Sequence, residues 1–201
     1  MTNLENIVYF LGMKILYSDK GIILHHLKYE LELLKRFKLI NWKSAITPAE
    51  TNHKLDYDVK GDDLDATTFK QFVGSLRCLC NSIPDICYAV GMMSRFMKKP
   101  NLSHYQVVVG TLRYIKGTLR CGVLFPSGAK YNLDIICYSY SDWCGDRVDR
   151  RSTFGYFFKY QGGLISWCSK KQPIVALSTC EAEYIAGTLS ACQVVWILNL
   201  L

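Results

Sequence analysis

The hydrophobic pattern of this 201-residue chain changes its period near Gly117, and this change limits the folds that the chain can adopt. Before that point, apart from a β-hairpin expected in the first 25 residues, apolar residues recur every three or four positions, which is the spacing of amphipathic helices. Beyond it the apolar residues alternate more nearly every second position, which is the spacing of strands. The sequence therefore predicts an α+β architecture in which a helical region comes before a strand-rich region.

Four segments with helical spacing are expected before Gly117. The first covers residues 27–39. Its apolar face is expected to consist of Leu27, Leu31, Leu34 and Phe37. Its charged residues, which include Glu30, are expected on the other faces of the helix. The other three are expected over residues 69–79, 86–97 and 103–116. His104 stands at the start of the last of these helices, where a capping or packing role is expected in preference to that of a base.

Two non-helical segments frame the first helix. A β-hairpin is expected over residues 7–25, with its turn at Ser18-Asp19-Lys20-Gly21. Residues 41–65 are polar and predict a long surface connection. The acidic pair Asp62-Asp63 in this connection is expected to be solvated.

The region after Gly117 predicts a β-meander followed by one helix. Strands are expected over residues 133–140, 154–160 and 164–168, with a fourth candidate at 174–177. Ser178 and Glu181 form a capping-box pattern that begins a final helix, in which Glu181 has a structural role. Such a sheet is incompletely covered, so an open edge on the 133–140 strand and an exposed Trp196 are expected to favour self-association.

The composition excludes a disordered tail, because 50% of the residues are apolar and 20% are charged. The net charge of +7 permits a polyanionic partner without requiring one. The nine cysteines include no C-x2-C pair, so a structural zinc site is not expected, and they are typical of thiols in a reducing compartment.

The N-terminus has no signal-peptide pattern, which favours an intracellular protein of the cytoplasm or nucleus. Residues 184–201 carry no charge and are close to the minimum length for a membrane span. Polar residues within this segment and the capping box before it favour a core helix, with a tail anchor as the alternative. No membrane association is therefore expected.

Several blocks of the sequence resemble one known family. They are YFLGMKI at 9–15, VGSLRCLC at 73–80, PDICYAVGMMSRFM at 84–97, LRYIKGT at 112–118, SDWCGDRVDRRST at 141–153 and ISWCSKKQPIVALSTCEAEYIA at 165–186. Together and in this order they are similar to the Pol polyprotein of Ty1/copia-type retrotransposons. The resemblance covers essentially the whole chain.

The resemblance implies two partial domains. Residues 1–120 would be the late part of a reverse transcriptase, with a primer-grip hairpin and a helical thumb or connection region. Residues 121–201 would be the N-terminal half of a ribonuclease H-like domain, a truncated meander with its helix. The family activities are RNA-directed DNA polymerisation and hydrolysis of RNA in RNA·DNA hybrids. The family's Y-V-D-D motif does not occur in this sequence, so polymerisation by this chain alone is not expected.

The ribonuclease H activity implied by the resemblance needs several carboxylates that converge on two Mg²⁺ ions. The family pattern Y-S-D-x-D-W-x-G-D places the first-strand Asp at Tyr140, and a phenol is a poor substitute for a carboxylate. Asp142 is a weak alternative ligand, because two residues along a strand displace it by about 6 to 7 Å. The A-E-Y-I-A pattern places the family's helix Glu, a catalytic residue and metal ligand, at Glu183, and the remaining ligands would lie beyond residue 201.

Basic side chains near this predicted site are candidates for contacts with nucleic acid. They are Arg147, Arg150, Arg151, Lys170 and Lys171. The alternative is that they are solvated loop charges.

The leading hypothesis is a copia-type Pol fragment that ancestrally acted on RNA·DNA hybrids and that neither binds Mg²⁺ productively nor catalyses hydrolysis. The alternative is a retained non-enzymatic protein that binds nucleic acid or interacts as an effector-like protein. A third hypothesis is a genomic relic without function.

Overall fold

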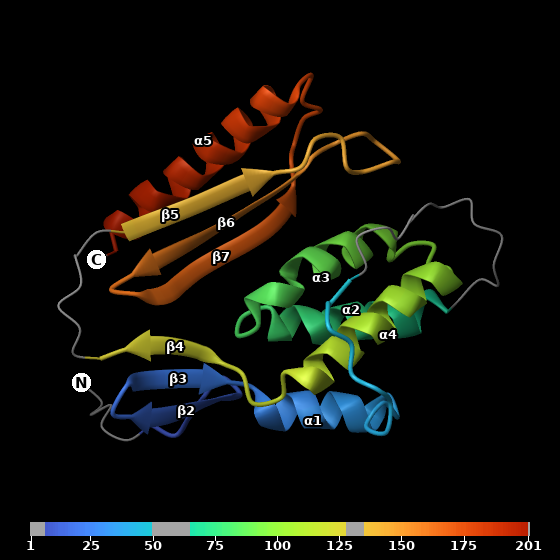
Figure 1. Ribbon diagram of the computed structural model, residues 1–201. Coiled ribbons are helices and arrows are strands. Elements are labelled where there is room, and N and C mark those ends of the chain that lie inside the picture. Colours follow the sequence, from blue (N-terminus) through green and yellow to red (C-terminus); the bar gives the residue numbers. More distant parts are fainter. Residues whose placement is uncertain (1–6, 50–64, 128–134, 201) are drawn as a thin grey trace. The chain divides into compact units, whose positions relative to one another are not determined.

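The computed structural model describes residues 7–49, 65–127 and 135–200, which form two compact units, Met1–Gly128 and Ala129–Leu201 (Figure 1). Within the described residues there are five α-helices and two antiparallel sheets, as expected for an α+β protein. The sequence placed the division after residue 120. The structure places strand β4 (Val123–Pro126) in the first unit, because β4 pairs with a strand near the N-terminus.

The sheet of the first unit has the order β1-β2-β3-β4. Its first three strands are β1 (Tyr9–Phe10), β2 (Met13–Ser18) and β3 (Gly21–His25), and the expected hairpin is formed by β2 and β3. Gly21 has a φ of +134°, and a Cβ atom there would lie 2.1 Å from the Phe125 carbonyl oxygen. A glycine is therefore required where β3 meets β4. The sequence missed β4, a short strand whose partner lies about a hundred residues earlier.

Four helices complete the first unit: α1 (Leu27–Arg36), α2 (Ala66–Leu79), α3 (Cys87–Met93) and α4 (Leu102–Gly117). Short 3-10 turns, Pro84–Ile86 and Ser94–Phe96, flank α3. Asn101 and His104 form a reciprocal cap at the start of α4, and the His104 ring stacks on Phe96 at 4.0 Å. The capping and packing role expected for His104 is confirmed, and burial lowers its pKa to about 4.

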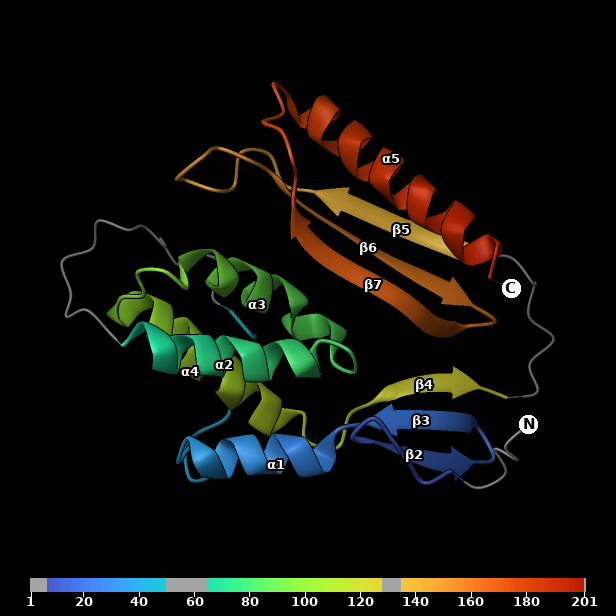
Figure 2. The same ribbon diagram turned by 180° about the vertical axis from the view of Figure 1, so that it is seen from behind.

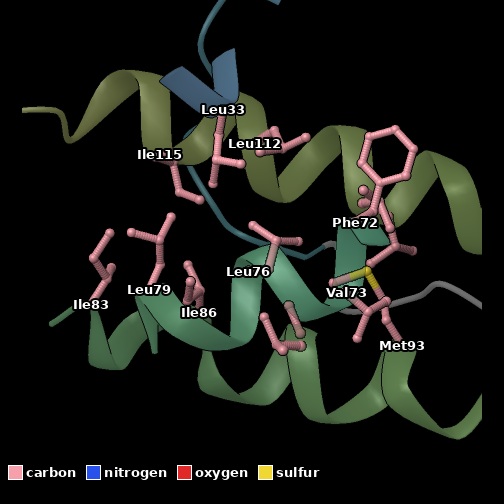
Figure 3. Packing of buried hydrophobic residues seen from close by; sticks show 14 of the residues in the cluster. Leu33, Phe72, Val73, Leu76, Leu79, Ile83, Ile86, Met93, Leu112 and Ile115 are labelled. Atoms are coloured by element: carbon pink, nitrogen blue, oxygen red, sulfur yellow. The ribbon is translucent and has the colours of Figure 1, made fainter. Parts of the chain in front are cut away.

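These helices bury one apolar cluster (Figure 3). Leu76 and Leu79 of α2 point into it together with Leu112 and Ile115 of α4, and Leu33 enters it from α1. The expected orientation of α1 is wrong in one respect. Glu30 lies on the buried face beside Leu33 and Leu34, whereas Leu31 is exposed.

Part of the predicted polar connection runs along α4. The backbone N–H of Ala45 donates to the Arg113 carbonyl at 3.2 Å, and the Arg113 Nε donates to the Lys43 carbonyl at 2.7 Å. Thr111 Oγ1 donates to the Pro48 carbonyl at 2.9 Å. Residues 41–49 are therefore attached to α4, and the pair Asp62-Asp63 lies outside the described residues.

The second unit consists of β5 (Ile135–Ser141), β6 (Thr153–Tyr160), β7 (Gly163–Lys171) and helix α5 (Thr179–Leu198). The sheet order is β5-β6-β7, and α5 runs alongside β5 (Figures 1 and 2). In the described part of the chain β5 is an edge strand, and Trp196 is exposed, as expected.

The fourth strand candidate, residues 174–177, is wrong. These residues form the loop before α5, where the Ala176 carbonyl accepts from Trp143 Nε1 at 3.1 Å. The Leu177 N–H donates to Glu181 Oε2 at 2.6 Å, and Ser178 Oγ accepts from the Glu181 N–H at 3.1 Å. The structural capping role of Glu181 is thereby confirmed. No helix in the described ranges is both long and apolar enough to cross a membrane.

Candidate functional site

The candidate site lies where the end of β5 meets the first turns of α5. Glu183 Oε1 accepts a hydrogen bond from the backbone N–H of Ser141 at 3.1 Å. Tyr140 immediately precedes Ser141, so the structure brings the helix carboxylate to the strand position at which the family pattern has an Asp. Glu183 is exposed, and its carboxylate satisfies an N–H group on the open edge of β5.

Gln172 holds these two elements together. Its Nε2 donates to Ser141 Oγ at 3.1 Å and to the Ala182 carbonyl at 2.8 Å, and its backbone N–H donates to the Ser152 carbonyl at 2.8 Å. The side chain is 1% exposed. No sequence pattern identifies Gln172, whose only signal is that it is an uncharged polar residue directly after strand β7.

Tyr140 has a packing role in this structure. A Cβ atom on Gly155, its partner on β6, would lie 2.3 Å from Tyr140 Cε1 and 2.9 Å from the phenol oxygen. The Tyr140 ring therefore lies directly over the glycine backbone, an arrangement in which an aromatic ring covers a glycine that has no side chain of its own. The absence of a Cβ at Gly155 makes this position of the ring accessible.

Asp142 is used by the loop that follows β5. Its Oδ1 accepts from the Thr153 N–H at 2.6 Å, and its own N–H donates to the Thr153 carbonyl at 3.0 Å. A Cβ on Gly145 would lie 2.3 Å from Asp142 Oδ2, so the loop backbone passes close to this carboxylate. Asp142 thus closes the β5–β6 ladder, and one of its oxygens already has a backbone donor.

The loop between β5 and β6 is organised around the buried carboxylate of Asp146. Lys171 Nζ lies 2.5 Å from Asp146 Oδ2 and 2.8 Å from Asp149 Oδ2. Asp146 Oδ1 also accepts from the Val148 N–H at 2.8 Å. Burial alone would raise the pKa of Asp146, but the bonds from Lys171 and the loop N–H groups outweigh it and hold that pKa below its usual value.

The five predicted nucleic-acid contacts separate into two groups. The charge of Lys171 is compensated by two carboxylates, and Arg151 Nε lies 3.7 Å from Asp149 Oδ2. The side chains of Arg147, Arg150 and Lys170 are exposed, and Arg147 has an interaction of its own. A basic surface at this end of the sheet would therefore be smaller than the sequence indicates.

The donor groups at the end of β5 do not fit a pair of Mg²⁺ ions. Such a pair requires several converging carboxylates, whereas here Glu183 accepts from the Ser141 N–H, Asp142 accepts from the Thr153 N–H, and the family's Asp position holds the phenol Tyr140. Over the part of the chain that the structure describes, no group of three or more His, Cys, Asp or Glu side chains is arranged to hold a metal ion.

Comparison with known proteins identifies relatives along almost the whole chain, although no family model and no solved structure matches. The Retrovirus-related Pol polyprotein from transposon RE1 of Arabidopsis thaliana is 37% identical over 98% of this chain, which spans 13% of that polyprotein. The corresponding polyprotein from transposon TNT 1-94 of Nicotiana tabacum is 36% identical over 95% of the chain, which spans 15% of it.

A shorter relative matches over most of its own length. It is an uncharacterized mitochondrial protein of Arabidopsis thaliana, 34% identical over 98% of this chain and 80% of that protein. With the Pol polyproteins, it shows similarity that runs through both structural units. The chain belongs to the family of retrovirus-related Pol polyproteins of copia-type transposons.

Proposed function

We propose that the second unit is the first part of a ribonuclease H-type domain, that the first unit is the late part of a reverse transcriptase, and that the chain engages RNA·DNA hybrids without hydrolysing them. The observation that carries this proposal is the Glu183–Ser141 hydrogen bond, which brings the helix carboxylate to the end of the first strand of the meander. The membership in the Pol family supports the assignment of both units.

The absence of hydrolysis is proposed on the basis of the donor groups. Attack of water on a phosphodiester by two-metal catalysis needs carboxylates that hold both ions. At this site Glu183 is used to accept from the Ser141 N–H, and Asp142 is used to close the loop. Tyr140 would have to ionise far below the ordinary pKa of a phenol, near 10, to contribute charge at neutral pH.

Binding is proposed to depend on exposed cations around this end of the sheet. Arg147, Arg150 and Lys170 have exposed side chains, and each can approach a phosphate without reading the base sequence. Such binding weakens as the salt concentration rises, because each phosphate contact displaces counterions from the nucleic acid.

The first experiment measures cleavage of an RNA·DNA hybrid by the purified chain in Mg²⁺ or Mn²⁺. We expect no turnover, and none in Tyr140→Asp, because one restored carboxylate leaves the set of ligands incomplete. Cleavage that disappears in Glu183→Gln would overturn the inactive assignment, since that variant removes the charge and retains the shape.

The second experiment measures affinity for the same hybrid as a function of salt concentration. Arg150→Ala should reduce the slope of log affinity against log salt by about one. Lys35→Ala, which removes an exposed cation from helix α1 of the other unit, is the matched control and should leave the slope unchanged. No binding by the wild-type protein at about 50 mM salt would contradict the proposal.

A further inference from the structure

Two cysteines of the first unit meet where the chain passes from helix α2 to helix α3. Cys80 directly follows α2, and Cys87 is the first residue of α3. The Cys87 thiol donates to the Cys80 carbonyl, with the sulfur and the oxygen 3.8 Å apart, and the two thiols also hydrogen-bond with each other. We call residues 80–87 the α2–α3 corner, and Cys80 and Cys87 the thiol pair.

Hydrogen bonds and packing within the corner fix the position of the thiol pair. The Leu79 carbonyl accepts from the backbone N–H groups of Ser82 at 3.0 Å and Ile83 at 2.8 Å, which turns the chain back at the end of α2. Ile83 and Ile86 belong to the buried apolar cluster, in which Figure 3 shows them beside Leu79. The approach of the two thiols is therefore part of the packed structure of the first unit.

The corner is also attached to other elements of the first unit. Ser82 Oγ lies 2.5 Å from Nδ1 of His26, the residue between β3 and α1. The Tyr114 hydroxyl of α4 donates to Asp85 Oδ2 at 2.7 Å. A covalent bond across the corner would therefore restrict a segment that contacts both the end of the sheet and α4.

The chemistry open to the thiol pair is oxidation. A structural metal site uses four ligands, and nowhere in the described part of the first unit are three or more His, Cys, Asp or Glu side chains arranged to hold a metal ion. Both thiols are only half-buried, so a small oxidant can reach them. Two neighbouring thiols that a small oxidant reaches are the starting point for a disulfide.

We propose that Cys80 and Cys87 form a reversible disulfide when the protein meets a small-molecule disulfide such as glutathione disulfide. The Cys87 thiolate attacks one sulfur of the small molecule and breaks its S–S bond, which releases one thiolate and leaves a mixed disulfide on Cys87. Cys80 then loses its proton to solvent and attacks the Cys87 sulfur, which releases the second thiolate. Two protein thiols are oxidised, one small disulfide is reduced, and its two thiolates take up the two protons.

The surroundings of Cys80 assign it the second step. The hydrogen bond with the Cys87 thiol and burial together raise the pKa of Cys80, and they outweigh the opposing charge of Arg77. Because the thiolate is the attacking form, Cys80 is a poor nucleophile toward a disulfide in solution. Once Cys87 carries the mixed disulfide, the attack by Cys80 is intramolecular, and proximity compensates for the small fraction of thiolate. This chemistry lies outside the proposed engagement of hybrids, which uses cations of the second unit.

The test maps the disulfide in the full 201-residue chain after incubation of the folded protein with excess glutathione disulfide. Remaining thiols are blocked with N-ethylmaleimide, and the protein is digested with trypsin. Cleavage after Arg77 and Arg95 releases residues 78–95, which contain Cys78 and the thiol pair. Mass spectrometry should find this peptide lighter by two hydrogen atoms at the thiol pair, with Cys78 outside the linkage. Dithiothreitol added before the blocking step should abolish the linked form.

Cys78→Ser is the matched control, because Cys78 is an exposed thiol two residues before Cys80. The linked peptide should persist in this variant, whereas Cys80→Ser should lose the link and retain glutathione on Cys87. Absence of the linked peptide from the wild type, or a link that runs through Cys78, would overturn the inference. Mapping of the wild type and Cys78→Ser decides the question even if Cys80→Ser does not fold.

A second measurement asks whether the disulfide fits the folded corner. A disulfide that closes a short loop restricts the unfolded chain, so oxidation should raise the urea midpoint of the first unit by about 1 M. The same treatment of Cys80→Ser should leave its midpoint unchanged. An unchanged or lower midpoint in the oxidised wild type would show that the bond strains the corner, and would also overturn the inference.

Discussion

The buried carboxyl group of Glu30 makes the stability of the first unit depend on pH. Glu30 is 1% exposed on the inner face of α1, and among the described residues neither of its carboxyl oxygens has a hydrogen-bond partner. Burial raises its pKa from the ordinary 4.5 to about 7. The folded protein therefore keeps Glu30 neutral at a pH where the unfolded chain has already ionised it.

The direction and size of the effect follow from this difference in pKa. Below the unfolded value of 4.5 both states are protonated, and Glu30 adds no pH dependence. As the pH rises toward about 7 the unfolded state is favoured, and above that value the loss of stability levels off. The whole shift corresponds to about 3 kcal/mol, of which about 2.5 kcal/mol develops between pH 5 and pH 8.

The assay is urea denaturation, followed by far-ultraviolet circular dichroism at pH 5 and at pH 8. Glu30→Gln removes the titration, so the unfolding free energy of the variant minus that of the wild type should increase by about 2.5 kcal/mol from pH 5 to pH 8. Taking the difference between variant and wild type cancels the contributions of other groups. His104 is one of these, since its lowered pKa makes the fold lose stability as the pH falls from 6.5 toward about 4.

Glu32→Gln is the matched control, because Glu32 is exposed on the same helix. Its stability relative to the wild type should be the same at both pH values. If Glu30→Gln also shows no change between pH 5 and pH 8, Glu30 is ionised or hydrogen-bonded in the folded state and the reasoning is refuted.

Two further predictions concern the second unit. Lys171→Met should lower the unfolding free energy of this unit by about 2 kcal/mol in the same urea titration, because the buried Asp146 carboxylate loses its cation. Arg151→Ala is the control. It removes a largely exposed ion pair and should cost less than about 0.5 kcal/mol. Gly155→Ala should cost about 1 to 3 kcal/mol through its clash with the Tyr140 ring, and a double-mutant cycle with Tyr140→Ala should recover most of that loss. Equal losses in the two backgrounds would contradict the contact.

Local sequence signals predicted those parts of the fold that depend on neighbours in the chain. The switch in period near Gly117 separated the helices from the meander, and the Ser178 cap placed the start of α5 correctly. The same signals failed for β4 and for residues 174–177, because the pairing of a short apolar segment depends on partners distant in sequence.

The candidate site was only partly predictable for the same reason. The family motif identified Glu183, and the structure places its carboxylate against Ser141. The motif did not indicate that Lys171 is neutralised by Asp146, or that Gln172 connects the strand to the helix. These contacts join segments from three different elements, so no local spacing records them.

The sequence by itself determined the family, the division into a helical and a strand-rich region and the replacement of a family Asp by Tyr140. Only the tertiary structure decided that the Tyr140 ring covers Gly155, that Glu30 is buried, and which cations near the site are compensated. The physical reason is that period and capping depend on residues within one or two turns, whereas burial and charge compensation depend on which segments of the folded chain come into contact.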